Sequence, residues 1–182
     1  MEIKYFNQGK IYLKGKKESV WINPDKDNLD NKNYEARIII FSEKTRNFVK
    51  LGTEENRVVI AGPGEYEIGG IEISGINSMY VLNIDGIKVV IMGKNEGEIS
   101  EKKKEKLEEA DVLMISLEAK SGELAKKSAA NYVIPIDYED KKEELKDFLD
   151  SFDRENLESI ESLRVEKENL PEAMEVVLLK TN

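Results

Sequence analysis

The first half of the chain is a succession of short apolar runs separated by residues that favour tight turns. Apolar, aromatic and β-branched side chains fill these runs, which is typical of strands rather than helices. The clearest turn is Asp85-Gly86, because both residues tolerate the positive φ angles that a two-residue hairpin requires. The predicted strands cover residues 3–6, 11–14, 20–23, 37–41, 58–61, 71–76, 79–84 and 87–92.

The second half alternates helical and strand patterns. Residues 139–152 place Leu145, Phe148, Leu149 and Phe152 on one face, which predicts an amphipathic helix packed against a sheet. The other predicted elements are helices at residues 100–109, capped by Ser100, and at 122–130, with strands at 112–115, 132–136, 163–165 and 174–179.

This order of elements predicts an α/β fold in which two sheets pack together with helices outside them. No segment rich in Gly, Ser or Pro divides the chain, so the sequence predicts one domain over residues 1–182. The polar residues 25–35 are expected to form an exposed loop within that domain.

The composition narrows the classes of function. Without cysteine the chain has neither disulfides nor thiol catalysis, and it also lacks histidine. With 37 acidic and 28 basic side chains its formal charge is -9, which would repel nucleic acid and anionic membranes, so neither is expected as a partner. No apolar run approaches the roughly 20 residues of a membrane span, and the first residues do not resemble a signal peptide. We therefore expect a cytoplasmic protein.

Several local motifs resemble the metallo-β-lactamase fold family, in particular its small stand-alone metal-dependent hydrolases. The best match is Gly62-Pro63-Gly64-Glu65-Tyr66-Glu67. The other motifs are residues 1–9, where such proteins have a strand ending in Gly-His-Ser, residues 20–24, where they have a strand ending in Asp-Pro, and Asn169-Leu170-Pro171-Glu172 before the last strand. The resemblance runs the full length and implies a four-layer αββα sandwich.

The resemblance also implies that every metal ligand has been replaced. The family's His-x-His-x-Asp-His motif aligns with residues 42–48, whose ligand positions hold Glu43, Thr45, Asn47 and Phe48. The aspartate that can bridge two metals corresponds to Lys94, and the final histidine corresponds to Asp137. Gln8 and Asn23 occupy the two earlier motifs.

These replacements predict that zinc is not bound. Phe48 offers no lone pair, and Thr45 and Asn47 offer only neutral oxygen atoms. The Lys94 ammonium would repel a divalent cation. One hypothesis is that Lys94 takes the place of the lost cation and pairs with Glu43 or Asp137. The alternative is that these three side chains reach solvent independently.

Two other motifs favour structural roles. The glycines of Gly62-Pro63-Gly64 and Gly69-Gly70 lack the lysine and hydroxyl residue of a phosphate-binding P-loop, so turns are favoured. Glu65 and Glu67 would share one strand face, but no partner base accompanies them in the sequence. A structural or solvent-facing role is therefore the better interpretation of both carboxylates.

The sequence thus predicts a catalytically inactive member of this family, a binding or assembly scaffold with no zinc, no cofactor and no catalytic residues. A homo-oligomer or an unidentified protein partner would fit such a scaffold. The alternative is a metal-dependent hydrolase with a rebuilt site around Glu43 and Asp137. Its oxygen ligands, which would include Gln8, Asn23 and Asn47, would suit Mg²⁺ or Ca²⁺ better than Zn²⁺.

Overall fold

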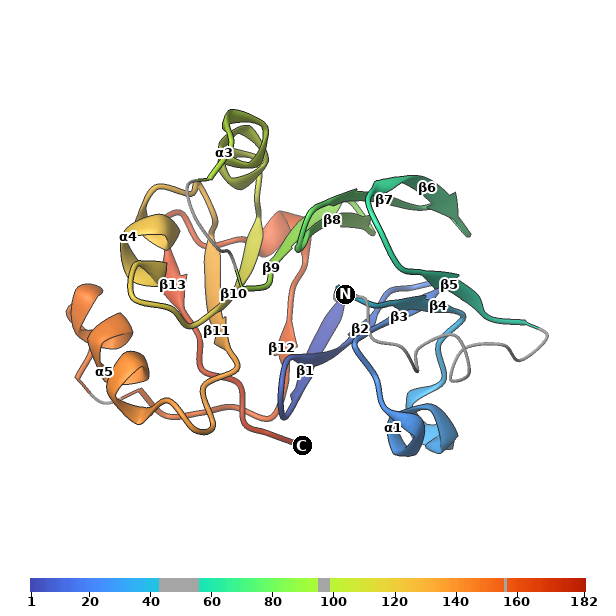
Figure 1. Cartoon of the computed structure of the whole chain (residues 1–182), viewed down its shortest axis with the longest axis horizontal. Helices are drawn as coiled ribbons and strands as arrows, with labels where there is room; N and C mark the ends of the chain where they lie inside the picture. The colour runs from blue at the N-terminus through green and yellow to red at the C-terminus, as the bar shows by residue number, and fades with distance from the viewer. Residues whose placement is uncertain (43–55, 95–98, 156) are drawn as a thin grey trace.

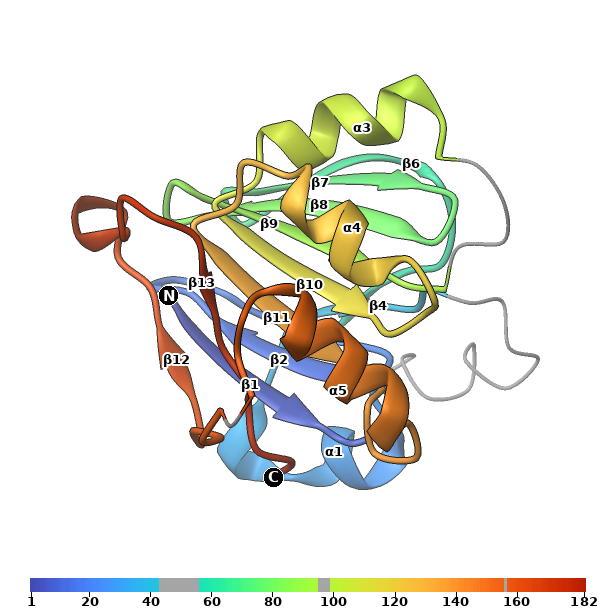
Figure 2. The same ribbon diagram turned by 90° about the vertical axis from the view of Figure 1, so that its left-hand side faces the viewer.

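The computed structural model describes residues 1–42, 56–94, 99–155 and 157–182. Two β-sheets face each other, and helices lie on their outer faces, as Figure 1 shows. The helices α3, α4 and α5 cover the outside of one sheet, and α1 lies outside the other (Figures 1 and 2). The predicted arrangement of two packed sheets with outer helices is confirmed.

The first sheet has the strand order β12-β1-β2-β3-β4-β5. Its strands β1, β2 and β3 form an antiparallel meander, whereas β3, β4 and β5 run parallel. This change of direction brings the loops after β1, β3 and β4 to the same edge of the sheet. The strands are β1 (Glu2–Phe6), β2 (Lys10–Lys14), β3 (Ser19–Ile22), β4 (Ile38–Ile40), β5 (Val58–Ile60) and β12 (Leu163–Arg164).

The second sheet has the order β13-β11-β10-β9-β8-β7-β6. The hairpin predicted at Asp85-Gly86 joins β8 to β9, with φ angles of 54° and 80° and with Ile84 paired to Ile87. From β9 onward the neighbouring strands β10, β11 and β13 are parallel. The strands are β6 (Gly64–Ile68), β7 (Ile71–Ile76), β8 (Met79–Ile84), β9 (Ile87–Met92), β10 (Val112–Ser116), β11 (Tyr132–Ile136) and β13 (Glu175–Val176).

The helices correct several predicted bounds. Residues 25–35 are not a loop, because Asp25 and Asn28 form a capping box that starts a short helix. Ser100 occupies the N-cap position of α3, but its side chain makes no capping hydrogen bond. The helix predicted at residues 122–130 is shorter, and the strand predicted at 174–179 contracts to β13. The helices are α1 (Lys26–Asp30), η1 (Lys32–Tyr34), α3 (Glu101–Glu108), α4 (Ser121–Lys126), α5 (Lys142–Ser151) and η2 (Lys167–Asn169).

The main core lies between the two sheets and consists mostly of Ile, Leu and Val side chains from both. A second cluster joins the outer face of the second sheet to its helices, for example through Leu107 of α3 and Phe148 of α5. On the outer face of the first sheet, the fully buried Trp21 packs among aromatic residues, including Tyr34 of η1. Among the described residues, no helix is both long enough and apolar enough to cross a membrane.

Candidate functional site: a cavity at the strand ends

A cavity of about 440 Å³ opens where loops from both sheets meet. Its volume falls within the range typical of small-molecule sites. One wall comes from the loops after β1, β3 and β4, and the other from the carboxyl ends of β9, β10 and β11. The lining residues are Gln8, Gly9, Asn23, Pro24, Asp25, Phe41, Ser42, Ile91, Gly93, Lys94, Ser116, Ile136, Asp137, Glu139, Asp140 and Lys141.

The second sheet brings three polar side chains to one edge. Ser116 is the last residue of β10, Lys94 follows β9 and Asp137 follows β11. Because β9, β10 and β11 are neighbouring parallel strands, their carboxyl ends lie side by side. In sheets of this kind ligands bind in the crevice outside those ends. The topology therefore places Lys94 and Asp137 on either side of Ser116.

Asp137 is held in place by protein hydrogen bonds. Its Oδ2 accepts a hydrogen bond from the Ser116 hydroxyl at 2.7 Å, and its backbone amide donates to the Tyr5 hydroxyl at 2.9 Å. Its backbone adopts the left-handed conformation, with φ of 57°. The carboxylate also lies against Gly9, where a Cβ atom, if one were added, would come within 2.9 Å of Asp137 Oδ1.

Tyr5 lies beneath this wall of the cavity and is fully buried. Its hydroxyl accepts a second hydrogen bond from the Gly9 amide at 3.5 Å. Burial raises the pKa of the Tyr5 hydroxyl, and the carboxylate of Glu139 raises that pKa further. Tyr5 is therefore neutral at physiological pH, and its hydroxyl joins the β1–β2 turn to the end of β11.

The opposite wall is fixed by Asn23 and Ser42. The Asn23 side chain donates to the Ser42 hydroxyl at 2.8 Å and accepts from the Ser42 amide at 2.8 Å. Asn23 also has a left-handed backbone, with φ of 50°, as does Gln8, with φ of 57°. Non-glycine residues in this conformation carry strain that commonly marks functional sites. Together with Asp137, three such residues line one cavity.

Asp25 is already neutralised by a neighbouring cation. Its carboxylate lies 2.8 Å from the Lys10 ammonium and accepts a hydrogen bond from the Asn28 amide at 2.9 Å. Burial alone would raise the pKa of Asp25, but the hydrogen bonds from Lys10 and from the helix amides lower that pKa overall. Asp25 therefore contributes structure to the cavity rim more than free charge.

Lys94 is exposed on the cavity wall. The predicted ion pair between Lys94 and Asp137 is wrong, because Asp137 bonds to Ser116 and no ion pair joins Lys94 to any residue within the described ranges. The other predicted partner, Glu43, lies outside the described residues. Strand β10 separates the end of β9, which Lys94 follows, from the end of β11, which Asp137 follows.

Four of the site residues predicted from the sequence, Gln8, Asn23, Lys94 and Asp137, line this cavity together. The other four, Glu43, Thr45, Asn47 and Phe48, lie outside the described residues. The sequence did not single out Ser116, although it directly follows the strand predicted at 112–115, as Asp137 follows the strand predicted at 132–136. Nor did it single out Tyr5 or Glu139, because no spacing connects residues so far apart in the chain.

The described donors do not fit a zinc ion. Within the part of the chain that the structure describes, no three His, Cys, Asp or Glu side chains gather in a metal-binding geometry. Asp137 is bonded to a hydroxyl, and the lining group that follows β9 is a cation, Lys94. Zinc sites take nitrogen or sulfur donors for most of their shell. Glu65 and Glu67, by contrast, are exposed on β6 and do not line the cavity.

Comparisons with known proteins identify the family to which this fold belongs. Residues 2–137 match the family model of the beta-lactamase superfamily domain, whereas no curated protein sequence matches. A Thermotoga maritima structure described as a putative zinc-dependent hydrolase of the metallo-β-lactamase superfamily superposes with a TM-score of 0.77 at 23% identity, covering 98% of each chain.

More distant structures share the same architecture. The metallo-β-lactamase fold protein YhfI from Bacillus subtilis gives a TM-score of 0.62 at 10% identity, covering 99% of this chain and 96% of YhfI. Zn²⁺-bound PqqB from Methylobacterium extorquens gives 0.59 at 9% identity, covering 87% of each chain. The family match covers most of the chain and the structural likeness nearly all of it, so the protein belongs to the beta-lactamase superfamily and has the metallo-β-lactamase αββα fold.

Proposed function

We propose that this protein is a non-hydrolytic member of the superfamily that uses the cavity as a metal-independent binding site. One observation carries the proposal: Asp137, where the resemblance to the family expects a metal ligand, accepts a hydrogen bond from Ser116, and the end of β9 supplies the Lys94 cation rather than a further donor. A chain without histidine or cysteine lacks the nitrogen and thiolate donors from which zinc sites take most of their shell.

The shape of the cavity supports a retained binding role. Gln8, Asn23 and Asp137 keep left-handed backbones around it, and each such residue costs of order 1 kcal/mol or more of stability. Hydrogen bonds with Tyr5 and Ser42 stabilise two of these three conformations. A surface with no role would gain stability from substitutions that relax this strain, so the strain favours a site still in use.

Metal content tests the proposal. Protein purified without chelator should contain well under one equivalent of metal by elemental analysis, and Zn²⁺, Mn²⁺, Mg²⁺ or Ca²⁺ should leave its melting temperature unchanged. The physical reason is the donor set, in which Lys94 opposes a divalent cation. A stoichiometric metal would overturn the proposal.

The same measurement addresses the alternative, a hydrolase with a rebuilt Mg²⁺ or Ca²⁺ site around Glu43 and Asp137. In that case Asp137→Asn should abolish metal binding, because an amide oxygen replaces a charged ligand. The matched control is Asp150→Asn, at an exposed residue of α5 that does not line the cavity. If metal binds and Asp137→Asn removes it while Asp150→Asn does not, the rebuilt-site hydrolase becomes the better interpretation.

A further inference from the structure

The charged side chains of the cavity fall into two groups, those with protein partners and those without a charged partner among the described residues. Asp25 is paired with Lys10, Glu139 lies against the Tyr5 hydroxyl, and the Lys141 ammonium donates to the Leu117 carbonyl at 2.6 Å. These side chains already interact with protein groups, so they have few hydrogen-bonding positions free for a ligand. Both groups lie in the same cavity, so the side chains without a charged partner determine which ligand charges the cavity can recognise.

The side chains without a charged partner carry both signs of charge and lie on different sides of the cavity. Lys94 is exposed and has no ion pair with any described residue, while Asp137 uses only Oδ2 for Ser116 and leaves Oδ1 without a hydrogen bond in the described ranges. Asp140 is exposed beside Asp137. The cavity therefore offers a cation on one side and carboxylate oxygens on the other.

The sheet sets the distance between these charges. Lys94 follows β9 and Asp137 follows β11, with β10 between them. At about 4.8 Å per strand, their backbones lie about 10 Å apart. Lys94 and Asp137 form no ion pair across this spacing, so a ligand with its two charges at the ends of a chain reaches both side chains more readily than one with both charges on a single carbon.

We infer that the cavity binds a small zwitterion with its carboxylate and ammonium at opposite ends of an extended chain, the carboxylate against Lys94 and the ammonium against Asp137 and Asp140. Short peptides and ω-amino acids both have this chemistry. Four apolar residues that line the same cavity, Pro24, Phe41, Ile91 and Ile136, would contact the ligand's middle. This inference rests on the proposed function, since a bound metal would occupy Asp137.

Calorimetry with charge-matched probes tests the inference. The probes are 6-aminohexanoate, which carries both charges, and hexanoate and hexylamine, which each keep one. The zwitterion should bind at least about tenfold more tightly than either analogue, because each lost charge-assisted hydrogen bond removes roughly that factor. The dipeptide L-alanyl-L-alanine is a second zwitterionic probe. If it binds more tightly than 6-aminohexanoate, the ligand class is short peptides; if it binds more weakly, the ligand class is ω-amino acids.

Two variants test which side chain contacts the carboxylate of the ligand and which contacts its ammonium. Lys94→Met should lower the affinity for 6-aminohexanoate to that for hexylamine, and Asp137→Asn should lower it toward that for hexanoate. Lys94 is exposed, so its substitution should leave folding intact. Lys32→Met removes an exposed charge that does not line the cavity and should change nothing.

The inference is overturned if hexanoate or hexylamine binds as tightly as the zwitterions, or if neither zwitterion binds at millimolar concentration. Metal content measured on the same sample separates the two possible failures. Metal-free protein that binds no zwitterion contradicts only the ligand class. Protein with stoichiometric metal contradicts the proposed function and this inference together.

Discussion

The hydroxyl of Tyr5 connects two segments that are distant in sequence. It accepts hydrogen bonds from the amides of Gly9 and Asp137, which lie 4 and 132 residues away. Gly9 leaves room for the Asp137 carboxylate, and Ser116 holds that carboxylate from the other side. The position of the Asp137 carboxylate in the cavity therefore depends on the buried Tyr5 hydroxyl, on the absence of a side chain at Gly9 and on Ser116.

Gly9→Ala should destabilise the protein more than Gly86→Ala does. Both glycines have positive φ, 70° and 80°, so alanine at either position costs about 1–2 kcal/mol through backbone strain alone. Only at Gly9 does the new Cβ approach another atom, Asp137 Oδ1 at 2.9 Å, whereas nothing lies within 4 Å of it at Gly86. The extra cost of overpacking should be about 1 kcal/mol or more in urea unfolding.

The contact with Asp137 can be isolated by a double variant. Ser116→Ala releases the carboxylate, so Gly9→Ala should cost less in that background than in the wild type. Equal destabilisation by Gly9→Ala and Gly86→Ala would show that the carboxylate moves aside freely and that the wall is not fixed as described.

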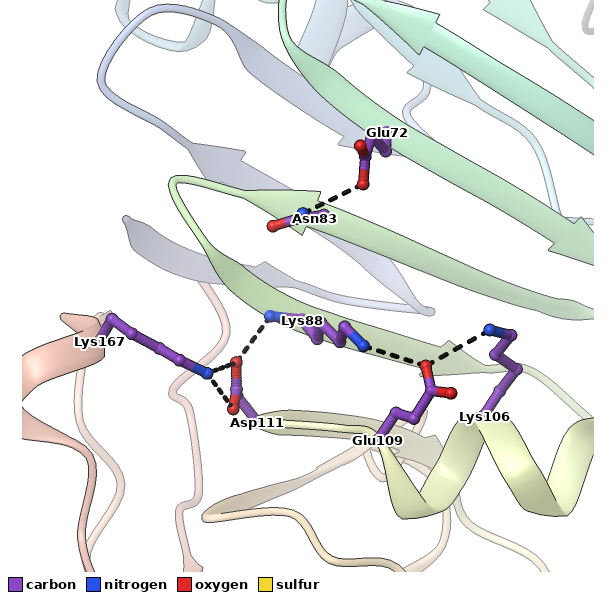
Figure 3. A network of polar contacts seen from close by, with 7 residues as sticks. All are labelled: Glu72, Asn83, Lys88, Lys106, Glu109, Asp111 and Lys167. Atoms are coloured by element: carbon purple, nitrogen blue, oxygen red, sulfur yellow. Dashed lines mark hydrogen bonds and ion pairs between the residues drawn. The ribbon is translucent and has the colours of Figure 1, made fainter.

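At the scale of elements, a polar network far from the cavity fastens η2 and α3 to the second sheet (Figure 3). Asp111, just before β10, accepts from the Lys88 amide and from the Lys167 ammonium, each at 2.8 Å. Glu109, two residues earlier, pairs with the ammonium groups of Lys88 at 3.0 Å and Lys106 at 3.3 Å. These two ammonium groups lower the pKa of the Glu109 carboxyl.

Because Asp111 is more buried than Glu109, its carboxylate should contribute more to the free energy of unfolding. Asp111→Asn should lower the free energy of unfolding by about 1–3 kcal/mol, because a nearly buried group loses charge-assisted hydrogen bonds. Glu109→Gln should cost at most about 1 kcal/mol, since its partners are exposed and water screens the pairs. Urea unfolding at low and high salt measures both, and an equal effect of the two variants would contradict the distinction.

The element predictions succeeded where the apolar period was uninterrupted. The bounds predicted for β7, β8 and β9 agree with the structure, because these strands alternate or run apolar throughout and are bounded by turn residues. The region 25–35 was missed because its helix is a single capped turn, stabilised by the Asp25–Asn28 box rather than by an apolar face. The strand near the C-terminus was overestimated because only Glu175–Val176 pair with β11.

At the scale of the whole molecule, Tyr80 joins the two sheets at the edge where the cavity opens. It lies in β8 of the second sheet, and its hydroxyl lies 3.2 Å from the carbonyls of Phe41 and Gly62, which flank strands of the first sheet. It also accepts from the Gly62 amide at 3.1 Å. Burial raises the pKa of Tyr80 above its ordinary value of 10.0, so the hydroxyl stays neutral at physiological pH.

Tyr80→Phe should therefore lower the free energy of unfolding by about 1–3 kcal/mol at neutral pH, because the Gly62 amide loses its partner. Tyr66→Phe is the matched control, since its hydroxyl makes one exposed contact of 3.5 Å to Pro63, and it should change stability by less than about 0.5 kcal/mol. The pH dependence gives a second test of Tyr80. A neutral hydroxyl stabilises the fold below its unfolded-state pKa, and this contribution is lost as pH rises through the raised folded-state pKa. The difference in the free energy of unfolding between wild type and Tyr80→Phe should thus shrink in alkaline urea titrations. A difference that persists unchanged there would contradict the role assigned to this hydroxyl.

The layered α/β fold, and the absence of histidine and cysteine from every possible ligand set, follow from the amino-acid sequence. Periodicity and turn residues encode the layers locally, and composition needs no structure. The hydrogen bond between Ser116 and Asp137, and those that Tyr5 accepts from Gly9 and Asp137, become visible only in the folded chain. Strand order and spacing set those distances, and strand order arises from packing the whole chain rather than from any local pattern.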